Sequence, residues 1–204
     1  MEQIDSAIIL AGGDSKRMGR DKNLIKLDGA LMIEVVTKKA ACWFKEVVVV
    51  VNNPQKYHFL NIENVRVIQD KIPTNSKCSL RGIYAGLDEI NSEYGFVIAG
   101  DMPFIQNSLV LAMAEKAATR AWEVVIPKYN HHYEPLFALY HKNCLPNMRA
   151  QLLSGNYKII DLLDRIKTLE LSSEFCKQYD PQLWSFFNIN TPEQLEIARR
   201  FFQK

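Results

Sequence analysis

The chain has 204 residues, of which 48% are hydrophobic and 24% are charged. This length and composition suit one globular domain and exclude a disordered tail protein, a collagen-like fibre and a coiled coil. Lysine and arginine number 25 against 23 acidic residues, which gives a net charge of +2. So balanced a charge argues against a protein that coats a nucleic-acid duplex, and we expect no nucleic-acid partner.

The four cysteines, at positions 42, 78, 144 and 176, form no Cys-x-x-Cys pair. We expect free thiols in a reducing cytosol, with Cys42 in the core because it falls among apolar helix positions. The first residues lack the basic and apolar segments of a signal peptide. The longest apolar run, Val47–Val51, is far shorter than the ~20 residues that span a bilayer. We therefore expect a cytoplasmic protein with no membrane contact.

Short apolar runs alternate with longer amphipathic stretches through the first half of the chain. In chain order, the pattern predicts a strand at Ala7–Ala11, a helix at Leu31–Phe44, strands at Val47–Val51 and Val65–Ile68, a helix at Leu80–Ile90, a strand at Tyr94–Ala99 and a helix at Ser108–Thr119. The five consecutive valines at 47–51 lack polar alternation, which is typical of a strand covered on both faces. This alternation of strand and helix predicts an α/β fold with a parallel sheet between two layers of helices.

The second half of the chain is less regular. Strands are predicted at Glu123–Pro127 and Pro135–Tyr140, on either side of a polar turn at Tyr129–Tyr133 that holds the surface pair His131-His132. Helices are then predicted at Asn143–Leu153 and Ile159–Ile166, followed by a strand at Lys167–Leu171. The last helix has Thr191 as N-cap and Pro192 at its first position. The Phe201-Phe202 pair is expected to dock this helix or a partner protein.

The loops that follow four of these strands are expected to form one rim. In parallel sheets, ligands bind beyond the carboxyl ends of the strands. The loops after Ala11, Val51, Ile68 and Ala99 should therefore lie together.

The loop after the first strand carries groups suited to phosphate. Gly12 and Gly13 let the backbone approach a bulky anion, and Ser15 adds a hydroxyl donor. Arg17 and Lys22 add positive charge for phosphate oxygens. Neither the Rossmann fingerprint nor the P-loop motif is present, and a solvated basic loop explains the composition about equally well.

A carboxylate ends another strand of the same predicted rim. Asp101 follows the strand at Tyr94–Ala99 and could hold Mg²⁺, which typically takes one or two carboxylates plus phosphate and water. A metal opposite Arg17 and Lys22 would bracket a polyphosphate, as phosphoryl or nucleotidyl transfer requires. The alternative for Asp101 is a plain turn aspartate.

Three weaker candidates follow other strands or open a helix. Asp70 could accept a hydrogen bond from a ribose hydroxyl or a base, and Asn53 follows the valine strand. Gly82 opens a helix and could allow close approach of a flat base.

The residues resemble those of a known family. Leu10-Ala11-Gly12-Gly13-x-Ser15-x-Arg17-Met18-Gly19-x-Asp21-Lys22 is similar to the signature of the molybdenum cofactor guanylyltransferases, members of the nucleotidyltransferase superfamily. Further blocks agree in order: Asp70, Leu80-x-Gly82-Ile83, Asp101-Met102-Pro103-Phe104, residues 134–140 and residues 187–192. The family often has Gly-Pro where this chain has Cys78-Ser79, and cysteine where it has Gly100.

The resemblance implies a single domain over residues 1–204, with a nucleotide-binding half at about 1–105 and a pterin-side half at about 106–204. It implies a three-layer Rossmann-like nucleotidyltransferase fold whose mostly parallel central sheet contains one antiparallel strand. It also implies transfer of GMP from MgGTP to the terminal phosphate of molybdopterin, in its molybdenum-loaded form in the cell, with release of pyrophosphate.

The resemblance further implies roles for individual residues. Arg17, Lys22 and Asp101 would be catalytic, and Asp101 would bind Mg²⁺. GTP would contact Leu10, Ala11, Gly12, Gly13, Ser15, Arg17, Lys22, Asn53, Asp70, Gly82 and Asp101. The pterin would contact Asn188 and Asn190.

Other readings and partners stay open at this point. A cytidylyltransferase or sugar-phosphate nucleotidyltransferase of the same fold is the alternative enzyme, and a non-catalytic nucleotide-binding protein is the alternative of another class. Molybdenum-insertion proteins and acceptor molybdoenzymes are the protein partners that the resemblance implies, and we expect a monomer.

Overall fold

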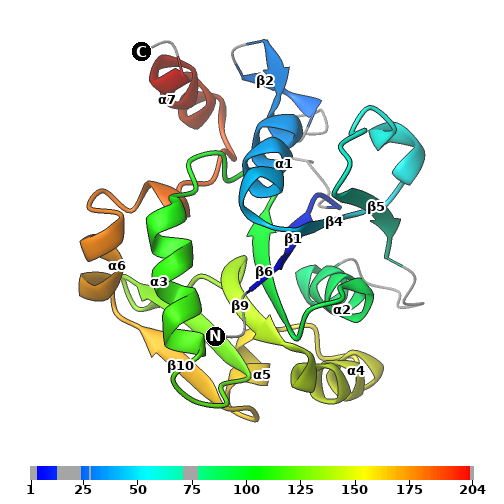
Figure 1. Cartoon of the computed structure of the whole chain (residues 1–204), viewed down its shortest axis with the longest axis vertical. Coiled ribbons are helices and arrows are strands. Elements are labelled where there is room, and N and C mark those ends of the chain that lie inside the picture. Colours follow the sequence, from blue (N-terminus) through cyan, green and yellow to red (C-terminus); the bar gives the residue numbers. More distant parts are fainter. Residues whose placement is uncertain (1–3, 13–23, 28, 71–77, 203–204) are drawn as a thin grey trace.

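The computed structural model describes residues 4–12, 24–27, 29–70 and 78–202. Its main sheet has the strand order β10-β7-β9-β6-β1-β4-β5, with β8 paired to β7. Figure 1 shows β6, β1, β4 and β5 side by side in this sheet. The strands are β1 (Ser6–Leu10), β4 (Glu46–Val51), β5 (Val65–Gln69), β6 (Tyr94–Ala99), β7 (Val124–Tyr129), β8 (His132–Tyr133), β9 (Phe137–His141) and β10 (Thr168–Leu171). A separate small sheet joins β2 (Lys26–Leu27) and β3 (Ala30–Leu31).

The main sheet is mostly parallel. Strand β1 pairs in parallel with both β4 and β6, β4 pairs in parallel with β5, and β10 pairs in parallel with β7. Strand β9 runs antiparallel to both of its neighbours, β6 and β7. The expected fold class, a mostly parallel sheet with one antiparallel strand in its main order, is confirmed.

Helices cover both faces of the sheet. They are α1 (Met32–Trp43), α2 (Ser79–Glu89), α3 (Asn107–Ala117), α4 (Leu145–Leu153), α5 (Ile160–Leu163), α6 (Ser173–Tyr179) and α7 (Pro192–Phe202). One core cluster contains side chains of α1, α3 and α6, and the second contains side chains of α2, α4 and α5. Figure 1 shows α2 beside α4, and α3 beside α6.

The valine strand shows why the sheet needs both layers. Val47, Val49 and Val51 belong to one core cluster, whereas Val48 and Val50 belong to the other. Successive side chains of a strand point to opposite faces, so an unbroken apolar run places hydrophobic surface on both faces. All five valines are at most 3% exposed.

Most predicted elements are present, and the differences are local. The helix predicted at Ile159–Ile166 is limited to the four residues of α5, and sequence analysis missed α6, the β2–β3 pair and the 3-10 turns at Pro54–Tyr57 and Trp184–Phe186. The prediction for Cys42 was wrong, because its side chain is exposed. All four thiols are free, as expected.

The last helix begins as predicted and docks through its aromatic pair. The Gln194 backbone N–H donates to Thr191 Oγ1 at 3.3 Å, and Pro192 is the first residue of α7. The rings of Phe201 and Phe202 lie 4.7 and 5.4 Å from that of Phe104. In the part of the chain that the structure describes, no helix has the length and apolar character needed to cross a bilayer.

Candidate active site

The parallel pairing brings the expected rim together. Leu10 of β1 pairs with Val50 of β4 on one side and with Ala99 of β6 on the other. The carboxyl ends of these strands therefore coincide, and the residues that follow them lie next to one another. Asp70 follows β5, which pairs with β4.

Backbone hydrogen bonds fix the start of the glycine loop on this rim. The Gly100 N–H donates to the Leu10 carbonyl at 2.9 Å, and the Ala11 N–H donates to the Val50 carbonyl at 2.9 Å. Two side chains that sequence analysis missed hold the next residues. The Asn52 amide donates to the Gly12 carbonyl, and the Tyr57 hydroxyl donates to the Ala11 carbonyl at 3.3 Å.

The metal-ligand candidate Asp101 lies at the middle of the rim, just after β6. It is 5% exposed. Its carbonyl accepts a hydrogen bond from the Ile189 N–H at 3.0 Å. This bond brings Asn188 and Asn190, far away in the sequence, beside the end of β6.

The asparagines beside Asp101 belong to a segment held by local bonds. The Asn188 amide donates to the Phe186 carbonyl at 3.3 Å, and the Asn190 N–H donates to Gln194 Oε1 at 2.7 Å. Among the described residues, no hydrogen bond to the Asn188 amide oxygen is found, which makes this oxygen a candidate acceptor for a ligand.

The nucleoside-side candidates lie where β5 and α2 meet. The Arg81 guanidinium, in the first turn of α2, lies 2.9 Å from the Asp70 carboxylate, and both side chains are 13% exposed. At Gly82 the Leu10 side chain comes close to the backbone of α2, because a Cβ at this position would lie 3.0 Å from Leu10 Cδ2. The missing side chain therefore lets α2 approach β1, in addition to any role toward a base.

Asn53 is used locally in the structure. Its side chain accepts a hydrogen bond from the Gln55 N–H at 3.1 Å and caps the 3-10 turn at Pro54–Tyr57. Its neighbour Asn52 makes the contact with the glycine loop. The predicted phosphate ligands Gly13, Ser15, Arg17 and Lys22 lie outside the described residues.

A further carboxylate, which the sequence did not single out as a ligand, reaches the same rim through β9. Because β9 is antiparallel, its first residues lie at the carboxyl ends of β6 and β7. The Ala99 N–H donates to the Leu136 carbonyl at 3.1 Å, and Glu134 stands two residues earlier. Burial raises the pKa of Glu134 to about 7.

The metal-binding capacity of this rim rests on oxygen ligands. Among the described residues, no group of three His, Cys, Asp or Glu side chains is placed to hold a metal ion. Asp101, a hard carboxylate at a strand end, fits Mg²⁺ that takes most of its other ligands from phosphates and water.

The fold defines a class: an α/β protein with a mostly parallel sheet, whose candidate ligand-binding rim lies at the carboxyl ends of the strands. Residues 7–169 match the family described as MobA-like NTP transferase domain. A relative from Natranaerobius thermophilus, named "Probable molybdenum cofactor guanylyltransferase", is 51% identical over 98% of this chain and 97% of its own. The "Molybdenum cofactor guanylyltransferase" of Desulfosudis oleivorans is 34% identical over 95% and 93%.

Solved structures agree with these relatives. The crystal structure of molybdopterin-guanine dinucleotide biosynthesis protein A from Archaeoglobus fulgidus has a TM-score of 0.84 and 28% identity, and covers 97% of this chain and 98% of its own. The structure of 4-diphosphocytidyl-2C-methyl-D-erythritol synthase from Anaerococcus prevotii has a TM-score of 0.70 at 16% identity, which shows the fold alone. The chain belongs to the molybdenum cofactor guanylyltransferases, within the MobA-like NTP transferase family.

Proposed function

We propose that this enzyme transfers GMP from GTP to the terminal phosphate of molybdopterin, with Mg²⁺ bound at Asp101. A phosphate oxygen of the acceptor attacks the α-phosphorus of GTP. A new P–O bond forms as the bond between the α-phosphorus and the oxygen bridging to the β-phosphorus breaks, and pyrophosphate leaves. The attacking phosphate is already ionised, so no general base is required.

The observation that carries this proposal is the position of Asp101 beside the start of the glycine loop. The Gly100–Leu10 hydrogen bond of 2.9 Å holds the residue before Asp101 against the end of β1, two residues before the glycine pair that begins the predicted triphosphate loop. Bound Mg²⁺ would neutralise charge on the phosphate oxygens. Asp101 would hold it from the sheet side, while Arg17 and Lys22 would bind the leaving pyrophosphate.

The nucleoside would lie over β1, β4 and α2. Leu10, Ala11 and Gly12 provide backbone and apolar contact on β1, with Gly13 and Ser15 next along the loop. Asp70, oriented by Arg81 at 2.9 Å, would accept a hydrogen bond from the nucleoside, and Gly82 lies in the same turn of α2. Asn188 and Asn190, held beside Asp101 through Ile189, would contact the pterin substrate.

The division of the chain into two halves is part of the same proposal. The nucleotide-binding half at about 1–105 supplies β1, β4, β5, β6 and α2, and the pterin-side half at about 106–204 supplies β9, β7 and the 188–190 segment. The two halves share one sheet, so we propose one domain with two subsites.

Substitution at both ends of the phosphate site tests the proposal. We expect Lys22→Ala and Asp101→Ala to abolish pyrophosphate release from GTP and molybdopterin, with an unchanged circular dichroism spectrum. Full activity of both variants would contradict the proposed site.

Nucleotide choice distinguishes the guanylyltransferase from its alternatives. In a binding assay with Mg²⁺, we expect GTP to bind at least ~10-fold more tightly than CTP or ATP, which corresponds to about 1.4 kcal/mol. Tighter binding of CTP would favour a cytidylyltransferase, and tight GTP binding without any turnover would favour a non-catalytic protein.

A further inference from the structure

The backbone of Glu134 is held at the β9 end of the rim by hydrogen bonds. Its backbone N–H donates to the Pro127 carbonyl at 2.9 Å, and its carbonyl accepts from the Phe137 N–H at 2.9 Å. The Tyr140 hydroxyl donates to the Pro135 carbonyl of the same turn at 2.9 Å. Bonds to β7 and β9 therefore fix the backbone that carries this side chain.

The side chain of Glu134 has no protein partner in the described part of the chain. It is half-buried, and no hydrogen bond or ion pair to its carboxylate occurs among the described residues. Burial raises its pKa to about 7, which is the expected effect of desolvation without a compensating donor. A desolvated carboxylate of this kind is poised to gain from a ligand that brings N–H donors.

The position of Glu134 in the fold indicates that it faces the acceptor substrate rather than GTP. The strand order β9-β6-β1 places the β9 end on the opposite side of Asp101 from the nucleoside-side strands β1 and β4. In-line displacement requires the attacking group to approach opposite the leaving pyrophosphate. The proposed function puts the leaving pyrophosphate at the loop after β1, so the acceptor would approach from the β9 and β7 side, where Glu134 lies.

The negative charge of Glu134 indicates which part of the acceptor this side chain can bind. A carboxylate repels the acceptor's phosphate, so it does not suit the phosphate end. The pyrimidine edge of a pterin carries a ring N–H and an exocyclic amino group side by side, which match the two oxygens of a carboxylate. We propose that Glu134 is a specificity-determining residue that binds this 2-amino-4-oxo edge of the acceptor's pterin ring.

This inference rests on the proposed function, so its test separates the two. Wild-type enzyme, Glu134→Gln and a control, Glu115→Gln, would be assayed for GMP transfer with GTP and molybdopterin. Glu115 is exposed on α3, and its substitution makes the same change of charge away from the rim. We expect Glu134→Gln to raise KM for molybdopterin ~10-fold or more while KM and Kd for GTP stay within twofold, because one charge-assisted acceptor pair is lost.

A probe pair tests the chemistry of the contact directly. Pterin and lumazine differ in that an oxo group replaces the 2-amino group in lumazine, so lumazine presents an oxygen to the carboxylate. We expect pterin to inhibit wild-type enzyme at least ~10-fold more strongly than lumazine, and Glu134→Gln to lose most of this preference. Glu115→Gln should keep it.

The outcomes differ for the two claims. Wild-type enzyme that fails to transfer GMP to molybdopterin would overturn the proposed function. Active wild-type enzyme with unchanged acceptor KM and unchanged pterin preference in Glu134→Gln would overturn only the role of Glu134. A loss of GTP binding in Glu134→Gln would also overturn it, by placing the residue in the nucleotide subsite.

Discussion

The partly buried carboxylate of Glu134 lowers the free energy of unfolding when it is ionised. Its folded-state pKa of about 7 lies above the ordinary value of 4.5. The unfolded chain ionises this group at lower pH than the folded chain does, so the penalty develops as pH rises from 4.5 to about 7 and is fully present above it.

Removing this charge should stabilise the protein. We expect Glu134→Gln to raise the free energy of unfolding at pH 8 by about 1 kcal/mol, after allowance for partial solvent screening. The gain should shrink as pH falls toward 4.5. Urea unfolding at pH 8, 6 and 5 measures it, and a variant less stable than wild type at pH 8 would contradict the account.

The Asp70–Arg81 pair offers a second test at this scale. Both side chains are 13% exposed, and their charged groups lie 2.9 Å apart. Removal of one partner takes away a close opposite charge at a site of low exposure, so Arg81→Met should lower the free energy of unfolding by about 2 kcal/mol.

A double-mutant cycle isolates the interaction between them. The Asp70→Asn/Arg81→Met double variant should lose clearly less stability than the sum of the single variants, because neither charge remains. Additive losses, measured by urea unfolding, would mean that the two side chains act independently.

At the scale of elements, the packing of α2 on β1 depends on glycine. A Cβ at Gly86 would lie 2.3 Å from Ile8 Cγ2 and 3.2 Å from Val50 Cγ2, in the middle of the sheet. The three atoms nearest to a Cβ at Gly82 all belong to the Leu10 side chain, with Cδ2 closest at 3.0 Å. The two positions share one helix and differ in how far their neighbours can yield.

Alanine at these two positions should therefore have different effects. We expect Gly86→Ala to lower the free energy of unfolding by about 1–3 kcal/mol through overpacking, despite the higher helix propensity of alanine. Gly82→Ala should stay within about 0.5 kcal/mol of wild type because Leu10 can rotate away. Equal losses in thermal unfolding would contradict this.

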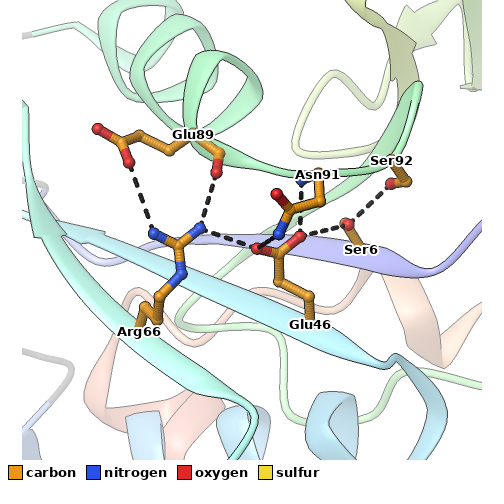
Figure 2. A network of polar contacts seen from close by, with 6 residues as sticks. All are labelled: Ser6, Glu46, Arg66, Glu89, Asn91 and Ser92. Atoms are coloured by element: carbon orange, nitrogen blue, oxygen red, sulfur yellow. Dashed lines mark hydrogen bonds and ion pairs between the residues drawn. The ribbon is translucent and has the colours of Figure 1, made fainter.

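A network of charged and polar side chains joins the amino-terminal ends of the strands, at the end of the sheet opposite the candidate active site (Figure 2). Glu46 at the start of β4 accepts hydrogen bonds from Arg66 at 2.8 Å, from the Ser6 hydroxyl at 2.8 Å and from the Asn91 N–H at 2.9 Å. Burial alone would raise the pKa of Glu46, but these hydrogen bonds from Asn91, Arg66 and Ser6 outweigh it, and the pKa lies below 4.5.

Because its pKa is lowered in the folded state, Glu46 contributes to the free energy of unfolding in a way that depends on pH. The stabilisation is fully present above pH 4.5 and is lost as pH falls through the lower folded-state pKa. Glu46→Gln should therefore be about 1–2 kcal/mol less stable than wild type at pH 7, with a smaller difference near pH 3. Thermal unfolding at both pH values measures this, with Glu115→Gln as the charge-matched control. An equal difference at both would contradict the account.

For the whole molecule, sequence patterns predicted the elements that bury surface on both faces. The valine run at 47–51 and the run at 94–99 could be assigned because a short unbroken apolar run indicates a strand covered on both faces. Short α6 and the β2–β3 pair were missed, since elements of seven and two residues carry little periodicity.

Sequence analysis could predict only the part of the candidate site that lies at the ends of parallel strands. Parallel strands place their carboxyl ends together, so the neighbourhood of Leu10 and Asp101 follows from element order. Asn52, Tyr57 and Glu134 could not be found in the same way, because their roles depend on tertiary contacts between strands distant in sequence.

The central claim is that one rim of the sheet gathers the GTP polyphosphate between the glycine loop and a metal held by Asp101. A crystal structure of the enzyme with GTP and Mg²⁺ tests it most directly. We predict Mg²⁺ at ~2.1 Å from an Asp101 carboxylate oxygen, with the guanosine over Leu10 to Gly12 and the β9 side open for the acceptor. Nucleotide bound elsewhere, or Mg²⁺ bound without Asp101, would contradict it.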